Sequence, residues 1–121
     1  MNEILRKKAD AEKSKIAESW GGLNWLSNSK ILNSEGLTLG RVVIKKGMAN
    51  PKHIHPNCDE VLYLLKGKLK HTVGDKAVIV EAGDTILIKA GIPHNGINIG
   101  EEDADMIVAY PASERKFTVV E

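Results

Sequence analysis

Three histidines and one glutamate have the residue types and spacing of a metal site. His53 and His55 are separated by one residue, so on an extended segment they project from the same face with Cα atoms about 6.6 Å apart. At that separation both imidazoles can bind one ion through bonds of about 2.0–2.1 Å. Glu60 follows after a short connection, and His94 comes from a distant segment. Such ligands suit divalent iron, manganese, nickel, copper or zinc, and the lack of thiolate argues against a soft structural site.

The elements that must position these residues read as strands. From about Leu23 onward, short β-rich runs alternate with turn signals. Many short strands at a spacing of about 8–12 residues are typical of an all-β sandwich or barrel. No stretch after residue 36 is long and periodic enough for a crossover helix, which argues against an α/β fold. The predicted strands are 37–45, 60–65, 68–73, 76–80, 85–89, 95–99 and 104–110.

The N-terminal part has a different character. Residues 3–18 are good helix formers without Gly or Pro, and Gly21 and Gly22 are expected to end the helix. Apolar residues are too sparse here to build a core. We therefore expect residues 1–22 to form a helical arm that docks on the main body or on a second subunit, and residues 23–121 to form the β-barrel domain.

Two sequence motifs resemble those of the cupin superfamily, and in particular small single-domain microbial cupins. Residues 47–67 match the first motif, and residues 83–98 match the second, with Lys89 where the motif has proline. The resemblance extends over about residues 37–110. The matching positions are Gly47, His53, His55, Glu60 and Gly67 in the first motif, and Gly83, Gly91, His94 and Asn98 in the second.

The resemblance implies a double-stranded β-helix, or jelly-roll barrel, with a short N-terminal helical arm. It also implies that one divalent transition metal is bound by His53, His55, Glu60 and His94. Taken alone, two histidines on a strand are more often just two polar residues on one face; the full set in register favours the metal site.

Strand alternation predicts which other side chains share the metal's side of each strand. If Glu60 points inward, Leu62 follows it into the pocket. Gly96 and Asn98 have the same parity as His94 and are expected to line the pocket as well. The face of the alternating row Met106, Val108 and Tyr110 stays open.

On the strand at 60–65, the residues that point away from the pocket are apolar too. Val61, Tyr63 and Leu65 would face outward, so the arm, a second sheet or another subunit must cover them. We expect a homodimer.

Composition excludes several classes of partner. A formal net charge of +1 offers no basic surface for nucleic acid. The longest uninterrupted apolar stretch, 61–65, is far too short for a membrane span, and a signal peptide is not expected. Cys58 is the single cysteine, which favours a reducing compartment and hence a cytoplasmic location. Its thiol has no neighbouring base in the sequence, which favours a neutral loop residue over a nucleophile.

Four further residues have a functional and a plainer interpretation. His71 could exchange protons, but an exposed strand histidine is the favoured interpretation. Trp20 and Trp25 could close over a ligand, but packing in the core or between subunits is favoured. Arg41 could bind an anion, but a surface or interface ion pair is favoured.

Three functions stay open at this stage. The first is an enzyme that chelates a small oxygen-rich organic molecule to the metal, of the dioxygenase, decarboxylase, isomerase or lyase type. The second is a cupin that binds or senses a small molecule without catalysis. The third, a structural or storage cupin, is disfavoured because packing alone does not require four ligands. The sequence assigns no catalytic residue, since fold does not select the reaction.

Overall fold

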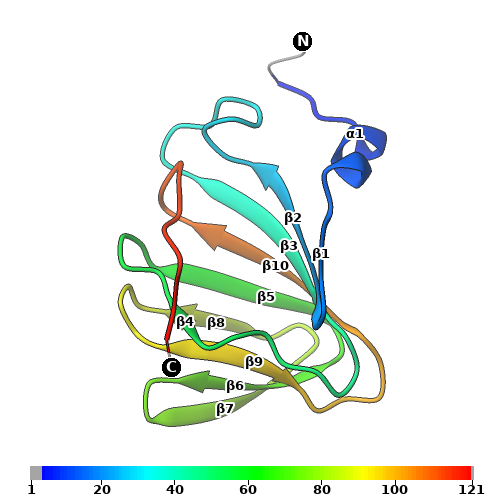
Figure 1. The fold of residues 1–121 in the computed structure, drawn as a ribbon, viewed down its shortest axis with the longest axis vertical. Helices are drawn as coiled ribbons and strands as arrows, with labels where there is room; N and C mark the ends of the chain where they lie inside the picture. Colours follow the sequence, from blue (N-terminus) through cyan, green and yellow to red (C-terminus); the bar gives the residue numbers. More distant parts are fainter. Residues whose placement is uncertain (1–3, 121) are drawn as a thin grey trace.

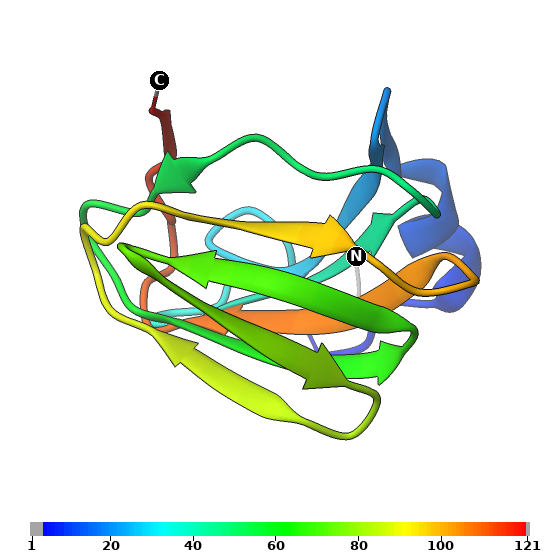
Figure 2. The same ribbon diagram turned by 90° about the horizontal axis from the view of Figure 1, so that it is seen from below.

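The computed structural model describes residues 4–120 and consists mainly of antiparallel strands in two facing sheets (Figures 1 and 2). The larger sheet has six strands in the order β1-β2-β3-β10-β5-β8, and the smaller has five in the order β11-β4-β9-β6-β7. This arrangement confirms the predicted jelly roll. The elements are α1 (Lys8–Lys13), β1 (Ile16–Glu18), β2 (Gly21–Ser27), β3 (Thr38–Ile44), β4 (His53–Ile54), β5 (Glu60–Lys66), β6 (Lys68–Val73), β7 (Lys76–Glu81), β8 (Thr85–Ile88), β9 (His94–Asn98), β10 (Ala104–Tyr110) and β11 (Thr118–Val119).

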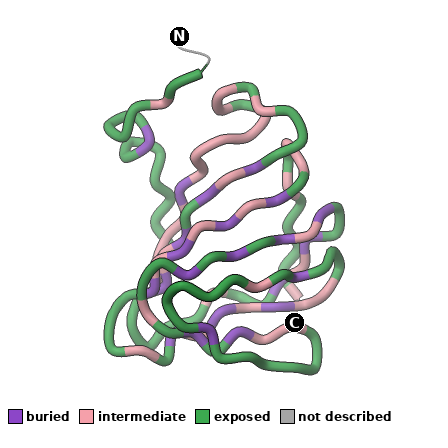
Figure 3. The backbone as a smooth tube through the Cα atoms, turned by 180° about the vertical axis from the view of Figure 1, so that it is seen from behind, coloured by how far each residue is buried: buried purple, intermediate pink, exposed green. Residues whose placement is uncertain are grey.

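Strand alternation divides the inner faces from the outer ones (Figure 3). On β10 every second residue is buried, so Met106, Val108 and Tyr110 face inward, which the sequence left open. On β5, Leu62 and Leu64 are buried. The alternating residues Val61, Tyr63 and Leu65 face outward and are 41%, 42% and 39% exposed. The expected outward apolar row is confirmed.

A glycine of the first motif makes the passage between the two sheets. Gly67 alone separates β5, in the larger sheet, from β6, in the smaller one. Its φ of +97° is a conformation that residues with a Cβ rarely adopt, and a Cβ there would lie 2.9 Å from Cα of Ala104. The motif therefore keeps glycine at this corner for steric reasons.

The predicted helix over residues 3–18 is wrong in its extent. Only Lys8–Lys13 are helical, and residue 3 lies outside the described residues. Residues 16–18 instead form β1, which pairs with β2, and Gly21 and Gly22 begin β2. Helix propensity is overridden here because the edge of β2 offers backbone hydrogen bonds to the segment after α1. The short helix packs on β2, where Ala11 is buried.

Candidate metal centre

Four predicted ligands meet between the two sheets. β4 and β9 are neighbours in the smaller sheet, with His53 directly opposite His94, and His55 follows just after β4. Glu60 is the first residue of β5, on the facing sheet. The antiparallel register of β4 and β9 therefore joins residues that are far apart in the chain, and sheet stacking brings the carboxylate to them.

The geometry of the four side chains fits one metal ion. One ligand atom from each of the four lies within 4.8 Å of the others, and all four residues are buried. Oε1 of Glu60 is 3.0 Å from Nε2 of His55 and 3.4 Å from Nε2 of His94. Two ligand atoms bound at about 2.0–2.1 Å and at roughly a right angle to each other would be about 3 Å apart. The cluster thus has the spacing of neighbouring ligands.

Hydrogen bonds fix the direction of all three imidazoles. Nδ1 of His53 donates to the carbonyl of Pro51 at 2.7 Å, and Nδ1 of His94 donates to that of Ile92 at 2.8 Å. Nδ1 of His55 donates to the carbonyl of Lys116, 61 residues away, at 2.9 Å. A carbonyl can only accept, so in each neutral ring Nδ1 carries the proton and Nε2 keeps its lone pair for a metal.

The tautomers leave a group of facing acceptors that a bound cation would satisfy. Nε2 of His55, Nε2 of His94 and Oε1 of Glu60 are buried and have no hydrogen-bond partner. Buried acceptors that face one another at these distances are costly unless a positive charge lies between them. A divalent transition metal fits this donor set of nitrogen and oxygen atoms.

Burial and neighbouring groups set the protonation states. Burial would raise the pKa of Glu60, but its contacts with His55 and His94 lower it, so the side chain is a carboxylate. Burial lowers the pKa of His53 from 6.5 to about 4, which keeps the imidazole neutral. Burial and the negative charge of the nearby Glu60 raise the pKa of Tyr110 well above 10, so its hydroxyl stays protonated. These are the states that metal binding requires.

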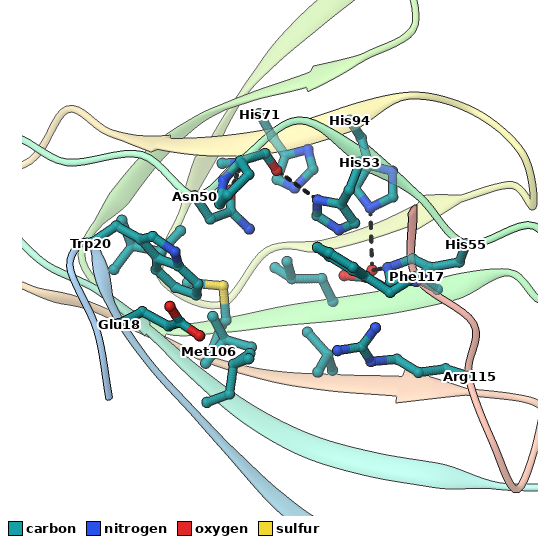
Figure 4. A pocket seen from close by; sticks show the side chains of 18 of the residues that line it. Glu18, Trp20, Asn50, His53, His55, His71, His94, Met106, Arg115 and Phe117 are labelled. Carbon is teal, nitrogen blue, oxygen red and sulfur yellow. Dashed lines mark hydrogen bonds and ion pairs between the residues drawn. The ribbon is translucent and has the colours of Figure 1, made fainter. Parts of the chain in front are cut away.

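The ligands form one wall of a cavity of about 400 Å³ (Figure 4). Leu62 and Gly96 line this cavity, as the sequence predicted. Asn98 does not lie among the lining residues. Its side-chain amide donates to the carbonyls of Ile44 and Glu102, each at 2.9 Å. The strand parity is right, but the side chain binds neighbouring backbone and holds the turn after β9.

The structure also places residues whose role the sequence left open. His71 is 3% exposed and lines the cavity, so the expectation of an exposed strand histidine is wrong. Its ring stacks near that of His94, with centroids 5.8 Å apart, and burial lowers the pKa of His71 to about 4. His71 lies two residues after Leu69 on β6, so both side chains point to the same, buried face of the strand. This alternation is the feature of the sequence that could have predicted the burial of His71.

The tryptophans, Arg41 and Cys58 follow the plainer interpretations in most respects. Trp25 packs against Tyr110, whereas Trp20 lines the cavity at the end opposite the histidines (Figure 4). Arg41 forms a bidentate ion pair with Asp105 on the outer face. Cys58 is buried, and burial raises the pKa of its thiol, so it is not a reactive thiolate.

Three cavity residues, Arg115, Phe117 and Val119, come from the segment after β10, where the sequence singled out none. Phe117 stacks on His53 with ring centroids 4.6 Å apart and an interplanar angle of 30°. Arg115 reaches the cavity beside it (Figure 4). The same segment supplies the Lys116 carbonyl to His55 and, through β11, a strand partner for β4.

Two facing sheets with a buried cluster of three histidines and one carboxylate at an inner cavity define a candidate metal-binding β-barrel. The family model described as the cupin domain matches residues 40–110, more than half of the chain. The chain belongs to the cupin family.

Several curated relatives are plant proteins. Oxalate oxidase GF-2.8 of Triticum aestivum is 35% identical over 86 residues, which cover 64% of this chain and 38% of that protein. Germin-like protein 3-5 of Oryza sativa subsp. japonica is 32% identical over 103 residues, 78% of this chain and 41% of that protein. The chain therefore spans about two fifths of the length of these relatives.

Solved structures share the fold. An oxalate oxidase in complex with the substrate analogue glycolate superposes with a TM-score of 0.78 at 24% identity, over 86% of this chain and 57% of the other. The formate complex of oxalate decarboxylase from Lactobacillus farciminis gives 0.83 at 21% identity, over 88% and 33%. Among the described residues, no helix has the length and apolar character to cross a bilayer.

Proposed function

We propose that this protein is a metal-dependent enzyme that acts on a small organic acid, which binds to a divalent transition metal held by His53, His55, Glu60 and His94. The observation that carries the proposal is the buried group of unsatisfied acceptors at the wall of a cavity. Relatives named oxalate oxidase support a small carboxylate as the substrate class.

The chain's own residues orient the site and limit its access to water. The carbonyls of Pro51, Ile92 and Lys116 orient the imidazoles. The Tyr110 hydroxyl stays protonated beside the Glu60 carboxylate. Phe117 covers His53 on one side. When bound, the metal supplies Lewis-acid or redox chemistry at positions that the four protein ligands leave open. Nδ1 of His71 donates to the carbonyl of Thr72, so Nε2 keeps its lone pair and could accept a hydrogen bond from a protonated group of a bound acid.

Elemental analysis and turnover test the proposal. Untagged protein purified without chelator is expected to hold about one transition metal per chain, and the identity of the metal narrows the reaction. Protein loaded with iron, manganese or zinc is then assayed for consumption of oxalate and glycolate, with His55→Ala as the inactive control. Protein that binds no metal at micromolar concentration would contradict the proposal. Tight binding of an acid without turnover for any of the three metals would make the protein a binding or sensing cupin instead.

We further propose a homodimer through the outer face of β5. Val61, Tyr63 and Leu65 are exposed there, and Leu87 on the adjacent β8 is 55% exposed, while α1 packs on β2. Such a contiguous apolar surface is characteristic of an interface. Light scattering at micromolar concentration is expected to give twice the chain mass of 13.2 kDa, and Tyr63→Glu is expected to give a monomer. A monomeric mass for the unaltered protein would overturn the idea.

A further inference from the structure

Arg115 differs from the other two arginines of the chain in what its guanidinium binds. Arg41 is bonded through two nitrogens to Asp105, and Arg6 donates to the Ser14 hydroxyl and to a backbone carbonyl. Among the described residues, Arg115 has no hydrogen-bond acceptor for any nitrogen of its side chain. Its Nε lies buried without a partner, as does Nε of Arg6, but Arg6 has acceptors for a terminal nitrogen. A half-buried guanidinium without an acceptor is energetically costly.

Aromatic rings hold this guanidinium in place. Its central carbon lies 4.3 Å from the ring centroid of Trp25, 5.1 Å from that of Phe117 and 5.6 Å from that of Tyr110. Contacts of this kind use the flat faces of the cation. The N–H groups lie in the plane of the guanidinium and point along its edges. The rings therefore fix the group and leave its donors for something else.

The position of Arg115 relates it to the candidate metal centre. Tyr110 and Phe117, which contact Arg115, also contact His55, with ring centroids 4.9 and 6.0 Å apart. The guanidinium is thus one aromatic ring away from a ligand. Figure 4 shows it pointing from the C-terminal segment toward the centre of the cavity, across from the histidines.

We propose that Arg115 binds a carboxylate of the same acid that chelates the metal, and so makes the site selective for dicarboxylates. This proposal rests on the proposed function. An ion with two positive charges, the Glu60 carboxylate and the Arg115 guanidinium together leave two positive charges at the inner site, which a dianion would neutralise. The planar fork of arginine matches carboxylate geometry through two parallel hydrogen bonds.

A plainer role for Arg115 is to stack on the aromatic rings and keep the C-terminal segment in place. The two roles predict different effects of substitution. A stacking role would disturb every ligand of the site to the same degree, because Phe117 and the Lys116 carbonyl support the metal ligands. A carboxylate-binding role affects only ligands that carry a free carboxylate oxygen.

Calorimetric titration of zinc-loaded full-length protein separates these roles. Zinc is used because it is redox-inactive, so oxalate is not oxidised during the measurement. Oxalate presents carboxylate oxygens beyond those that chelate the ion, whereas acetohydroxamate chelates through two oxygens and has no carboxylate. In Arg115→Gln we expect oxalate to bind about 10- to 100-fold more weakly, since one charge-assisted pair is lost, and acetohydroxamate to bind as before. Arg115→Lys is expected to recover part of the oxalate affinity.

The matched control is Lys52→Gln, which removes the same charge from an exposed residue next to His53. It should leave both affinities unchanged. Unaltered oxalate binding in Arg115→Gln would overturn the Arg115 proposal and leave the proposed function standing. Equal weakening of both ligands would assign Arg115 a structural role. Failure of the unaltered zinc-loaded protein to bind either ligand would contradict the proposed function itself.

A measurement on the unaltered protein covers the case in which Arg115→Gln does not fold. Phenylglyoxal modifies accessible arginines, and the site of modification is read by peptide mass spectrometry. Oxalate is expected to slow modification of Arg115 in the zinc-loaded protein and to leave Arg6 unaffected. Equal rates at Arg115 with and without oxalate would overturn the proposal.

Discussion

The two sides of the cavity are built in different ways. The ligand side comes from β4, β5, β9 and the residue after β4, and each histidine is oriented by a backbone carbonyl. The adjoining side includes the C-terminal segment 111–120, in which only Thr118–Val119 form a strand, paired with β4. The ligand side has fixed spacing and matched tautomers, as metal binding requires. The C-terminal segment presents an aromatic ring and an arginine to whatever the metal binds. This comparison suggests that the sheets provide the reactivity and the C-terminal segment provides the selectivity.

Removal of one ligand is the largest expected perturbation of the ligand side. His94→Ala takes away one of four ligand atoms, so metal affinity should fall by more than the roughly 10- to 100-fold loss that follows removal of an outer-shell partner. Chelator competition followed by elemental analysis measures the change.

His71→Asn is the control, because His71 is a buried histidine on the same cavity wall that is not in the four-residue cluster. It should keep the metal. Equal metal loss in both variants would show that the cluster as drawn is not the binding site.

Acid should disturb the ligand side and leave the charge of Arg115 intact. His53 and His71 have pKa values lowered by burial from 6.5 to about 4, so in the metal-free protein the unfolded chain binds more protons between these values. The stability due to each neutral imidazole is complete above about pH 6.5 and is lost as pH falls toward 4, by about 2 kcal/mol for each group at pH 4.5.

Chemical denaturation of metal-free protein at pH 7 and pH 4.5 measures this loss of stability. In His71→Asn the loss should be smaller by the contribution of one histidine. A free energy of unfolding that does not change between the two pH values would mean that these imidazoles are accessible to water in the folded state.

The smallest effect tests how far the C-terminal segment supports the ligands. Phe117→Ala removes the ring stacked on His53, and metal affinity should fall by about 2- to 10-fold, the range expected for one aromatic pair. Thr118→Ala, in the exposed neighbouring position, is the control and should bind metal normally. A loss as large as that of His94→Ala would remove the distinction between the two sides of the cavity.

Much of the fold followed from local pattern. Each of the seven predicted runs contains or overlaps one observed strand, from β3 to β10, because alternating apolar residues between turn signals specify strands directly. The predicted helix was too long because helix propensity takes no account of the backbone hydrogen bonds that β2 offers to residues 16–18. β4 and β11 have two residues each, too short for any periodicity.

The sequence by itself determined the four candidate ligands and the strands that hold them, because motif spacing and two-residue periodicity are local properties of the chain. Only the tertiary structure decided that His71 faces the cavity and that Arg115 and Phe117 lie beside His55 and His53. The placements of Arg115 and Phe117 depend on contacts such as that of Phe117 with His53, which lies 64 residues away in the chain. Such contacts arise when the segment after β10 returns to β4, and no local pattern encodes that return.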